Sequence, residues 1–83
     1  MDTKLQVIQV LASVLNLGAR ADALTLESPL LGALPELDSV SVVSTLTALE
    51  ERFGLVIEDD DMDGRTFATL GDLVAFVDRK LAG

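Results

Sequence analysis

Ser39 is the hydroxyl of this chain that is best placed to carry a phosphate-linked group. It follows Asp38 and precedes Val40, at the start of a stretch whose apolar spacing is that of an amphipathic helix. The first turn of a helix leaves backbone N–H groups without partners and carries partial positive charge. A phosphodiester on the Ser39 oxygen would therefore lie where an anion is favoured. Taken alone, the Asp-Ser pair is weak evidence, because both residue types are common helix caps.

The composition limits the chemistry that the chain can perform by itself. Its 83 residues include no Cys and no His. Disulfides, Cys/His zinc sites, thiol nucleophiles and histidine bases are therefore excluded. Neighbouring acids such as Glu50 and Glu51 do not face each other on a helix, so they do not indicate an acid–base pair. We expect no catalytic residue and no enzyme, and any sulfur chemistry would have to come from a cofactor.

The charge of the chain restricts its partners. Fourteen acidic and six basic residues give a net charge of −8. Nucleic acids and anionic membranes need a basic face, so neither is expected as a partner. The charge favours enzymes with basic docking patches. The chain begins Met-Asp-Thr-Lys without a positive n-region and has no membrane-spanning apolar run, which predicts a cytoplasmic monomer without membrane insertion.

An acidic segment follows the middle of the chain and invites a test for calcium. Three alternating acids precede Gly64, as in the first half of a calcium-binding loop: Asp59, Asp61 and Asp63. Counting from Asp59, the eighth position is Thr66 and the twelfth is Leu70. The loop needs an apolar residue and a carboxylate there. We therefore predict no metal site, with a solvated acidic face or weak divalent binding as the alternatives.

The first helix is predicted over about residues 3–17, ending at Gly18. Thr3 and Gln6 have the spacing of a capping box at its start. Its inward-facing residues would be Leu5, Ile8, Leu11, Ala12 and Leu15.

The second helix is predicted from about Ser39 to Phe53, capped by Asp38 and ended by Gly54. Its inward-facing residues would be Val43, Leu46, Leu49 and Phe53.

The last helix is predicted from a capping box of Thr69 and Asp72. Its apolar stripe would be Leu73, Val74, Val77 and Leu81. A short minor helix is expected near 59–63 or 66–68, and a helical turn near 30–34.

Two connections complete the predicted chain. Residues 18–37 form a long first connection whose leucines would hold it against the core. Residues 55–57 would be an extended link that inserts Ile57 into the core. Together the elements predict a single all-α domain over residues 1–83. It would be a small antiparallel bundle of three main helices plus a short minor helix, with the long loop between the first two.

Most of the chain resembles the acyl carrier protein family. The resemblance is carried by Asp38-Ser39-Val40, by the Leu-Glu-Glu-x-Phe-Gly segment at 49–54, by Ile57 before the acidic segment, and by residues 66–73. It implies that Ser39 carries 4′-phosphopantetheine, with Asp38 positioning Ser39 and Val40 beside the arm, and Val43 flanking it as well. It also implies a phosphopantetheinyl transferase, acyl-activating or acyl-transferring enzymes as partners, acyl groups held as thioesters, and a cleft between the second and last helices.

One departure from the family pattern bears on the pathway. Carriers of fatty-acid synthesis tend to have acids through the first half of the second helix, where this chain has Ser41, Ser44, Thr45 and Thr47. The departure favours a specialised acyl, lipid or polyketide-type pathway over housekeeping fatty-acid synthesis. A peptidyl or aminoacyl carrier would use the same serine and stays open as an alternative. So does a cofactor-free helical interaction module, which would need no serine chemistry.

Overall fold

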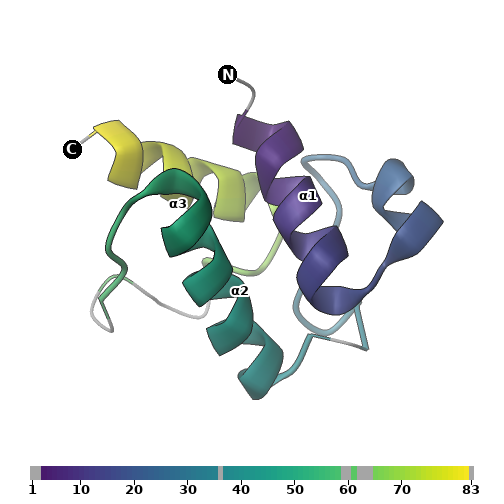
Figure 1. Ribbon diagram of the computed structural model, residues 1–83. Coiled ribbons are helices and arrows are strands. Elements are labelled where there is room, and N and C mark those ends of the chain that lie inside the picture. The colour runs from purple at the N-terminus through teal and green to yellow at the C-terminus, as the bar shows by residue number, and fades with distance from the viewer. Residues whose placement is uncertain (1–2, 36, 59–60, 62–64, 83) are drawn as a thin grey trace.

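Among the residues that the structure describes, three α-helices and one short 3-10 helix are the named elements of the fold (Figure 1). They are α1 (Thr3–Leu15), η1 (Gly18–Ala23), α2 (Ser39–Phe53) and α3 (Leu70–Ala82). This is a computed structural model, and it describes residues 3–35, 37–58, 61 and 65–82. Within those residues the only β-type pairing is an isolated bridge between Pro29 and Thr69. The predicted all-α fold with three main helices is confirmed.

α1 ends two residues earlier than predicted. Asn16 has a φ of 58°, and a left-handed residue stops an α-helix. Asn tolerates this conformation better than most residues, so it takes the role that was expected of Gly18. Gly18 instead opens η1, which is the short minor helix of the described chain. α1 starts at Thr3 itself, so the capping box predicted at Thr3 and Gln6 is misplaced.

The buried face of α1 is also rotated from the prediction. The buried residues are Val7, Val10, Leu11 and Leu15, whereas Leu5 is 51% exposed. Ile8 and Ala12 pack at the margin of the core. α1 contacts both α2 and α3, so its buried face is wide. This face includes Val7 and Val10, which the apolar spacing did not place inward.

α2 has the predicted ends. The Asp38 side chain caps it, and Gly54 closes it in the left-handed conformation with a φ of 66°. Leu49 is buried, and Leu46 and Phe53 pack against the core as expected.

Two positions of α2 contradict the prediction. Val43, expected to face inward, is 63% exposed, and Thr45, expected on the surface, is completely buried. Thr45 lies one turn before Leu49, so the two residues share the inner face of the helix.

α3 begins at the predicted cap. The Asp72 N–H donates to Thr69 Oγ1 at 3.1 Å, and the Thr69 hydroxyl donates to the Asp72 carboxylate at 3.0 Å. Leu73, Val74 and Val77 are buried together with Leu70 and Phe76. Leu81 is 47% exposed, contrary to the prediction, because the last turn of α3 extends beyond the core.

The long first connection is bonded to the start of α3. Four backbone hydrogen bonds of 2.8–3.0 Å join residues 26–31 to residues 67–71: Leu30 N–H to Ala68 O, Leu31 N–H to Phe67 O, Leu70 N–H to Ser28 O and Gly71 N–H to Leu26 O. Leu30 and Leu37 are buried, which confirms that the leucines of this connection hold it against the core. Leu26 and Leu31 are exposed exceptions.

The helical turn expected near residues 30–34 is present, because the Leu34 N–H donates to the Leu30 carbonyl at 3.0 Å. Residues 65–68 are turns and not the minor helix expected there, and most of the alternative range, 59–63, lies outside the described residues. The link after α2 has no helix or strand, and Ile57 packs against the core as predicted. The Ile57 N–H donates to the Glu50 carboxylate at 2.8 Å, which ties the link back to α2.

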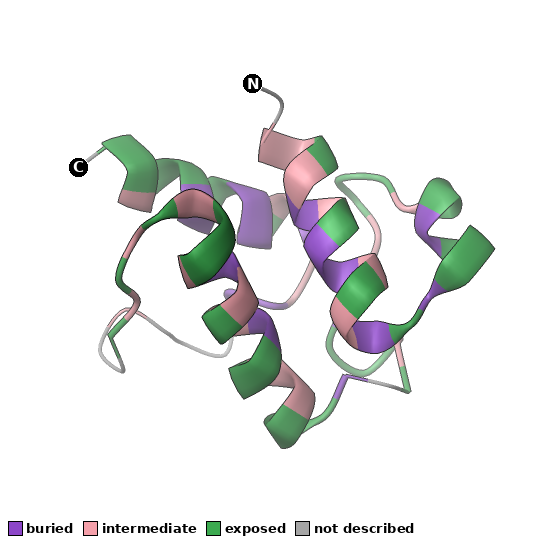
Figure 2. Cartoon of the chain, viewed as in Figure 1, coloured by how far each residue is buried: buried purple, intermediate pink, exposed green. Residues whose placement is uncertain are grey.

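α1 is the common packing partner of the other two main helices. It contacts both α2 and α3, whereas α2 and α3 make little direct contact with each other. α1 and α2 run in opposite directions, and the buried positions of the helices lie mainly on sides that face the centre (Figures 1 and 2). In the part of the chain that the structure describes, no helix is long and apolar enough to cross a membrane.

Candidate functional site

Ser39 is the first residue of α2 and is exposed to solvent. Before it, Asp38 has extended backbone, and its carboxylate accepts a 2.8 Å hydrogen bond from the Ser41 N–H. The Asp38 carbonyl accepts the first helical bond, from the Val42 N–H, also at 2.8 Å. Side chain and backbone of Asp38 thus fix the turn from which Ser39 projects, as its residue type predicts.

The Asp38 carboxyl is held in its charged form. The hydrogen bond from the Ser41 N–H lowers the pKa of Asp38 below its ordinary value of 3.8, and further bonds from this turn act in the same direction. An ionised Asp38 complements the partial positive charge of the helix start. The cap is therefore at full strength at neutral pH.

The Ser39 hydroxyl is free for modification as far as the described residues show, because none of their hydrogen bonds involves its oxygen. The remaining N–H groups of the first turn have no acceptor one turn back in the helix. A phosphate diester on the Ser39 oxygen would lie beside these groups. The site therefore fits an anionic, covalently attached group on chemical and steric grounds.

An apolar border lies next to this hydroxyl. Val40 is 73% exposed and Val43 is 63% exposed, the latter one helical turn after Ser39. Apolar side chains exposed this far beside a polar site mark a contact surface rather than a core. Both residues are placed to flank an arm that leaves from Ser39.

Fewer hydroxyl residues of α2 are exposed beside Val40 and Val43 than the sequence suggested. Ser44 and Thr47 are exposed, Ser41 is half-buried, and Thr45 is not on the surface at all. Thr47 satisfies its hydroxyl by donating to the Val43 carbonyl at 3.1 Å. Only three of the four predicted hydroxyl residues can therefore meet a partner.

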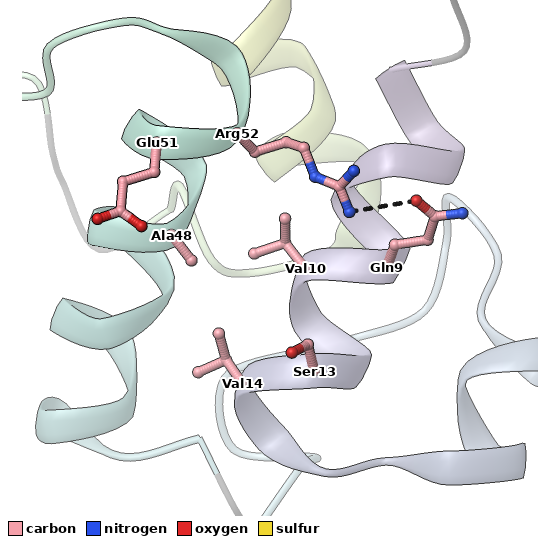
Figure 3. Close-up of a pocket in the computed structure, with 7 residues that line it drawn as sticks. All are labelled: Gln9, Val10, Ser13, Val14, Ala48, Glu51 and Arg52. Atoms are coloured by element: carbon pink, nitrogen blue, oxygen red, sulfur yellow. Dashed lines mark hydrogen bonds between the residues drawn. The ribbon is translucent and has the colours of Figure 1, made fainter.

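A cavity that α2 lines lies away from Ser39. A hollow of about 310 Å³ lies between α1 and α2 and is lined by Gln9, Val10, Ser13, Val14, Ala48, Glu51 and Arg52 (Figure 3). Arg52 donates to Gln9 Oε1 at 3.3 Å across it. Ser39 is not among its lining residues, so this hollow is not the attachment site.

Little of the predicted acidic segment lies within the described residues. Asp61 is paired with Lys80 of α3 at 2.8 Å, and its carboxylate also accepts from the Glu58 N–H. The hydrogen bond from Lys80 lowers the pKa of Asp61. Among the described residues, no group of three or more acidic side chains could hold a metal ion. The prediction about Asp59 and Asp63 falls outside them.

The sequence around Ser39 is similar to that of known proteins. A family model for the phosphopantetheine attachment site matches residues 6–77. The acyl carrier protein of Clostridium perfringens strain SM101 is 36% identical over 62 residues, which cover 75% of this chain and 78% of that protein. The chain belongs to the acyl carrier protein family.

Two further relatives agree with this membership. The acyl carrier protein of an Exiguobacterium species is 41% identical over 44 residues, 53% of each chain. The solution structure of a holo acyl carrier protein from Nitrosomonas europaea is 48% identical over the full length of both chains, with a TM-score of 0.92. The predicted family is confirmed, and so is its cofactor, covalently attached 4′-phosphopantetheine. As a member, the chain works with a phosphopantetheinyl transferase and with enzymes that handle acyl groups.

The roles of two residues of α2 were not predicted from the sequence. Glu50 anchors the link after α2, and Thr45 lies in the core of the bundle. The position of Thr45 had a usable signal, because it stands four residues before the core Leu49 on the same helix. The contact of Glu50 depends on how the chain folds back and has no local signal.

Proposed function

We propose that Ser39 is the residue that carries 4′-phosphopantetheine, and that residues 1–83 act as one carrier domain. The observation that carries this proposal is the exposed Ser39 hydroxyl at the first residue of α2, within the region that matches the attachment-site family. Asp38 acts as the positioning residue, because it fixes the turn that presents Ser39. Val40 lies beside the arm as an apolar contact.

Other hydroxyls near α2 are less suitable. Ser44 and Thr47 are exposed, but they lie inside the helix, where backbone N–H groups are already bonded to carbonyls. Ser41 is half-buried, and its N–H is occupied by Asp38. Ser28 of the first connection accepts a hydrogen bond from the Thr25 N–H. None of these combines an exposed oxygen with a place at the first residue of a helix, where backbone N–H groups lack a helical acceptor.

The chain itself is a carrier and not an enzyme in this proposal. The cofactor supplies the terminal thiol that forms the thioester, since the chain has no Cys. Attachment to Ser39 keeps the acyl group at high effective concentration for each partner enzyme. The chain's own contribution is to hold that anchor on the rigid first turn of α2 and to present a surface around it.

The surface around Ser39 bears on the pathway. It offers Val40, Ser44 and Thr47 to a partner, with the next exposed acid at Glu51. Apart from Asp38, enzymes with basic patches would find no acidic side chain on the exposed first half of α2, which supports a specialised acyl, lipid or polyketide-type pathway. The net charge of −8 still favours basic partners in general and argues against nucleic acid. A monomer acting in the cytoplasm, where coenzyme A is available, completes the proposal.

Intact-mass measurement tests the proposal. We expect wild-type protein to gain one phosphopantetheine when incubated with coenzyme A and a broad-specificity transferase. Ser39→Ala should abolish the gain, whereas the matched variant Ser44→Ala, an exposed serine of the same helix, should retain it. Far-UV circular dichroism checks that both variants are folded.

The same measurement separates the alternatives. Modification that persists in folded Ser39→Ala would place the arm on another residue and refute the proposal. A wild-type protein that never gains mass would favour the cofactor-free interaction module. Loading of the holo protein by an amino-acid-activating enzyme, but by no acyl-activating enzyme, would favour the peptidyl or aminoacyl carrier.

A further inference from the structure

The interior of the bundle contains a hydroxyl without a partner. Thr45 of α2 has 0% of its surface exposed, and its Oγ1 makes no hydrogen bond among the described residues. Leu49, one turn later on the same face, is also completely buried. Thr45 therefore points its hydroxyl into the apolar core.

This arrangement is costly and is avoidable. Buried hydroxyls are nearly always hydrogen-bonded, because an unpaired one loses its hydrogen bonds to water and gains none within the protein. A threonine within a helix usually donates to the carbonyl four residues earlier. Thr47 does so, with its hydroxyl 3.1 Å from the Val43 carbonyl, although water could reach it. Thr45 is the threonine that most needs such a bond, and it lacks one.

Thr45 lies close to the proposed anchor. It follows Ser39 by six positions, which is about 9 Å along a helix axis. A flexible group attached to Ser39 can cover that distance. α2 is held mainly by α1 and makes little direct contact with α3.

We propose that Thr45 is a specificity-determining residue, whose hydroxyl bonds to an oxygen substituent of the cargo when the acyl chain lies within the bundle along α2. The inference rests on attachment at Ser39. A threonine hydroxyl both donates and accepts, so it suits a hydroxyl or a carbonyl oxygen on the chain. A saturated chain of the same length would leave it unpaired. A buried group of this kind discriminates strongly against the analogue that lacks the partner atom.

The test compares matched cargoes on the loaded protein. A broad-specificity transferase can load Ser39 from three acyl-coenzyme A donors of equal length: saturated, 3-hydroxy and 3-oxo. Thermal melting of each form is compared with that of the holo protein without cargo. We expect the two oxygenated chains to raise the melting temperature of wild-type protein more than the saturated chain, by about 4 °C or more, the shift expected for one added hydrogen bond in a domain of this size.

Three variants isolate the hydroxyl. Thr45→Val keeps the shape, and we expect it to be at least as stable as wild type without cargo and to lose the preference for oxygenated chains. Thr45→Ser restores a hydroxyl and should restore the preference. Thr47→Val removes a hydroxyl that is already bonded and exposed, and should discriminate as wild type does.

Several results would overturn the inference. Equal shifts for all three cargoes in wild type would do so, as would discrimination that survives in Thr45→Val. A Thr45→Val protein that is less stable than wild type without cargo would show that the hydroxyl already has a partner inside the protein. Stabilisation by the unloaded arm alone, with no difference between cargoes, would assign the bond to the arm. Intact mass separates the two proposals: absent loading refutes attachment at Ser39, whereas complete loading without discrimination refutes only the role of Thr45.

Discussion

The Asp38 carboxylate accepts a 2.8 Å hydrogen bond from the backbone N–H of Ser41, and the exposed Ser39 is one of the two residues between them in the first turn of α2. The bond spans the proposed attachment point without using its hydroxyl. It follows that the geometry of the anchor depends on a carboxylate, and hence on pH.

Acid should weaken the protein through two carboxyls, Asp38 and Asp61. Folding lowers both pKa values. The cause at Asp38 is the hydrogen bond from the Ser41 N–H, and the cause at Asp61 is the hydrogen bond from Lys80. Each group therefore binds fewer protons when folded, so its stabilisation is complete above the ordinary value of 3.8 and is lost as the pH falls through the lower folded-state pKa. Urea unfolding at a series of pH values across this range should show the decline.

The Asp38→Asn variant isolates the cap in that series. Asn also caps helices but does not titrate, so the decline with acid should be shallower than in wild type. Glu51→Gln is the control, since its exposed carboxylate makes none of the described hydrogen bonds, and it should follow the wild-type curve. Identical acid sensitivity in wild type and Asp38→Asn would contradict the prediction.

Added acids on α2 should improve recognition by fatty-acid elongation enzymes. Ser44 and Thr47 are the exposed positions for this, because Ser41 is half-buried within the capped turn. We expect Ser44→Glu with Thr47→Glu to raise the specificity constant of the loaded carrier by about tenfold through electrostatic steering, and added salt to remove most of the gain. Ser44→Gln with Thr47→Gln is the uncharged control. Wild-type protein that already performs as a housekeeping carrier would refute the specialised pathway.

Salt should stabilise the protein. Self-repulsion at a net charge of −8 lowers stability, and salt shortens its reach to about 8 Å at physiological ionic strength. The melting temperature should therefore rise with sodium chloride, and rise further and gradually with millimolar magnesium or calcium, which bridge carboxylates. Melting curves at matched ionic strength test this. A sharp, calcium-specific increase at one equivalent would instead reveal a true calcium loop.

Gly71 should not tolerate a side chain. A Cβ at this position would lie 2.9 Å from the Leu26 carbonyl oxygen, which accepts the hydrogen bond from the Gly71 N–H. The obstacle is backbone, so the first connection would have to move away from α3. We expect Gly71→Ala to destabilise the protein by about 1–3 kcal/mol in urea unfolding. Ala75→Ser, at an exposed position of the same helix, is the control; an unchanged stability of Gly71→Ala would show that the connection moves freely.

The parts of the fold that follow from short-range signals were predictable. Both ends of α2 were, because Asp38 caps the helix and Gly54 adopts the left-handed conformation that closes it. The start of α3 was predictable in the same way from Thr69 and Asp72. The position of Ser39 was therefore predictable, because it lies at the start of α2.

The parts that depend on distant contacts were not predictable. η1 and the early end of α1 at Asn16 follow from where the first connection must go. The orientation of α2 about its axis is set by packing on α1, which exposes Val43 and buries Thr45. Hydropathy alone predicts the opposite, because valine is more hydrophobic than threonine.

The pairing of residues 26–31 with residues 67–71 has a consequence for synthesis. A ribosome releases α1, the first connection and α2 well before it releases the segment to which that connection is bonded. The connection, and with it the approach to Ser39, can therefore reach its final form only when residues 67–71 have emerged. Non-local contacts of this kind are the ones that form late. The nascent chain thus exposes its serine before that serine has its folded surroundings, so a transferase that recognises the folded surface would modify chains in which residues 67–71 have paired in preference to those in which they have not.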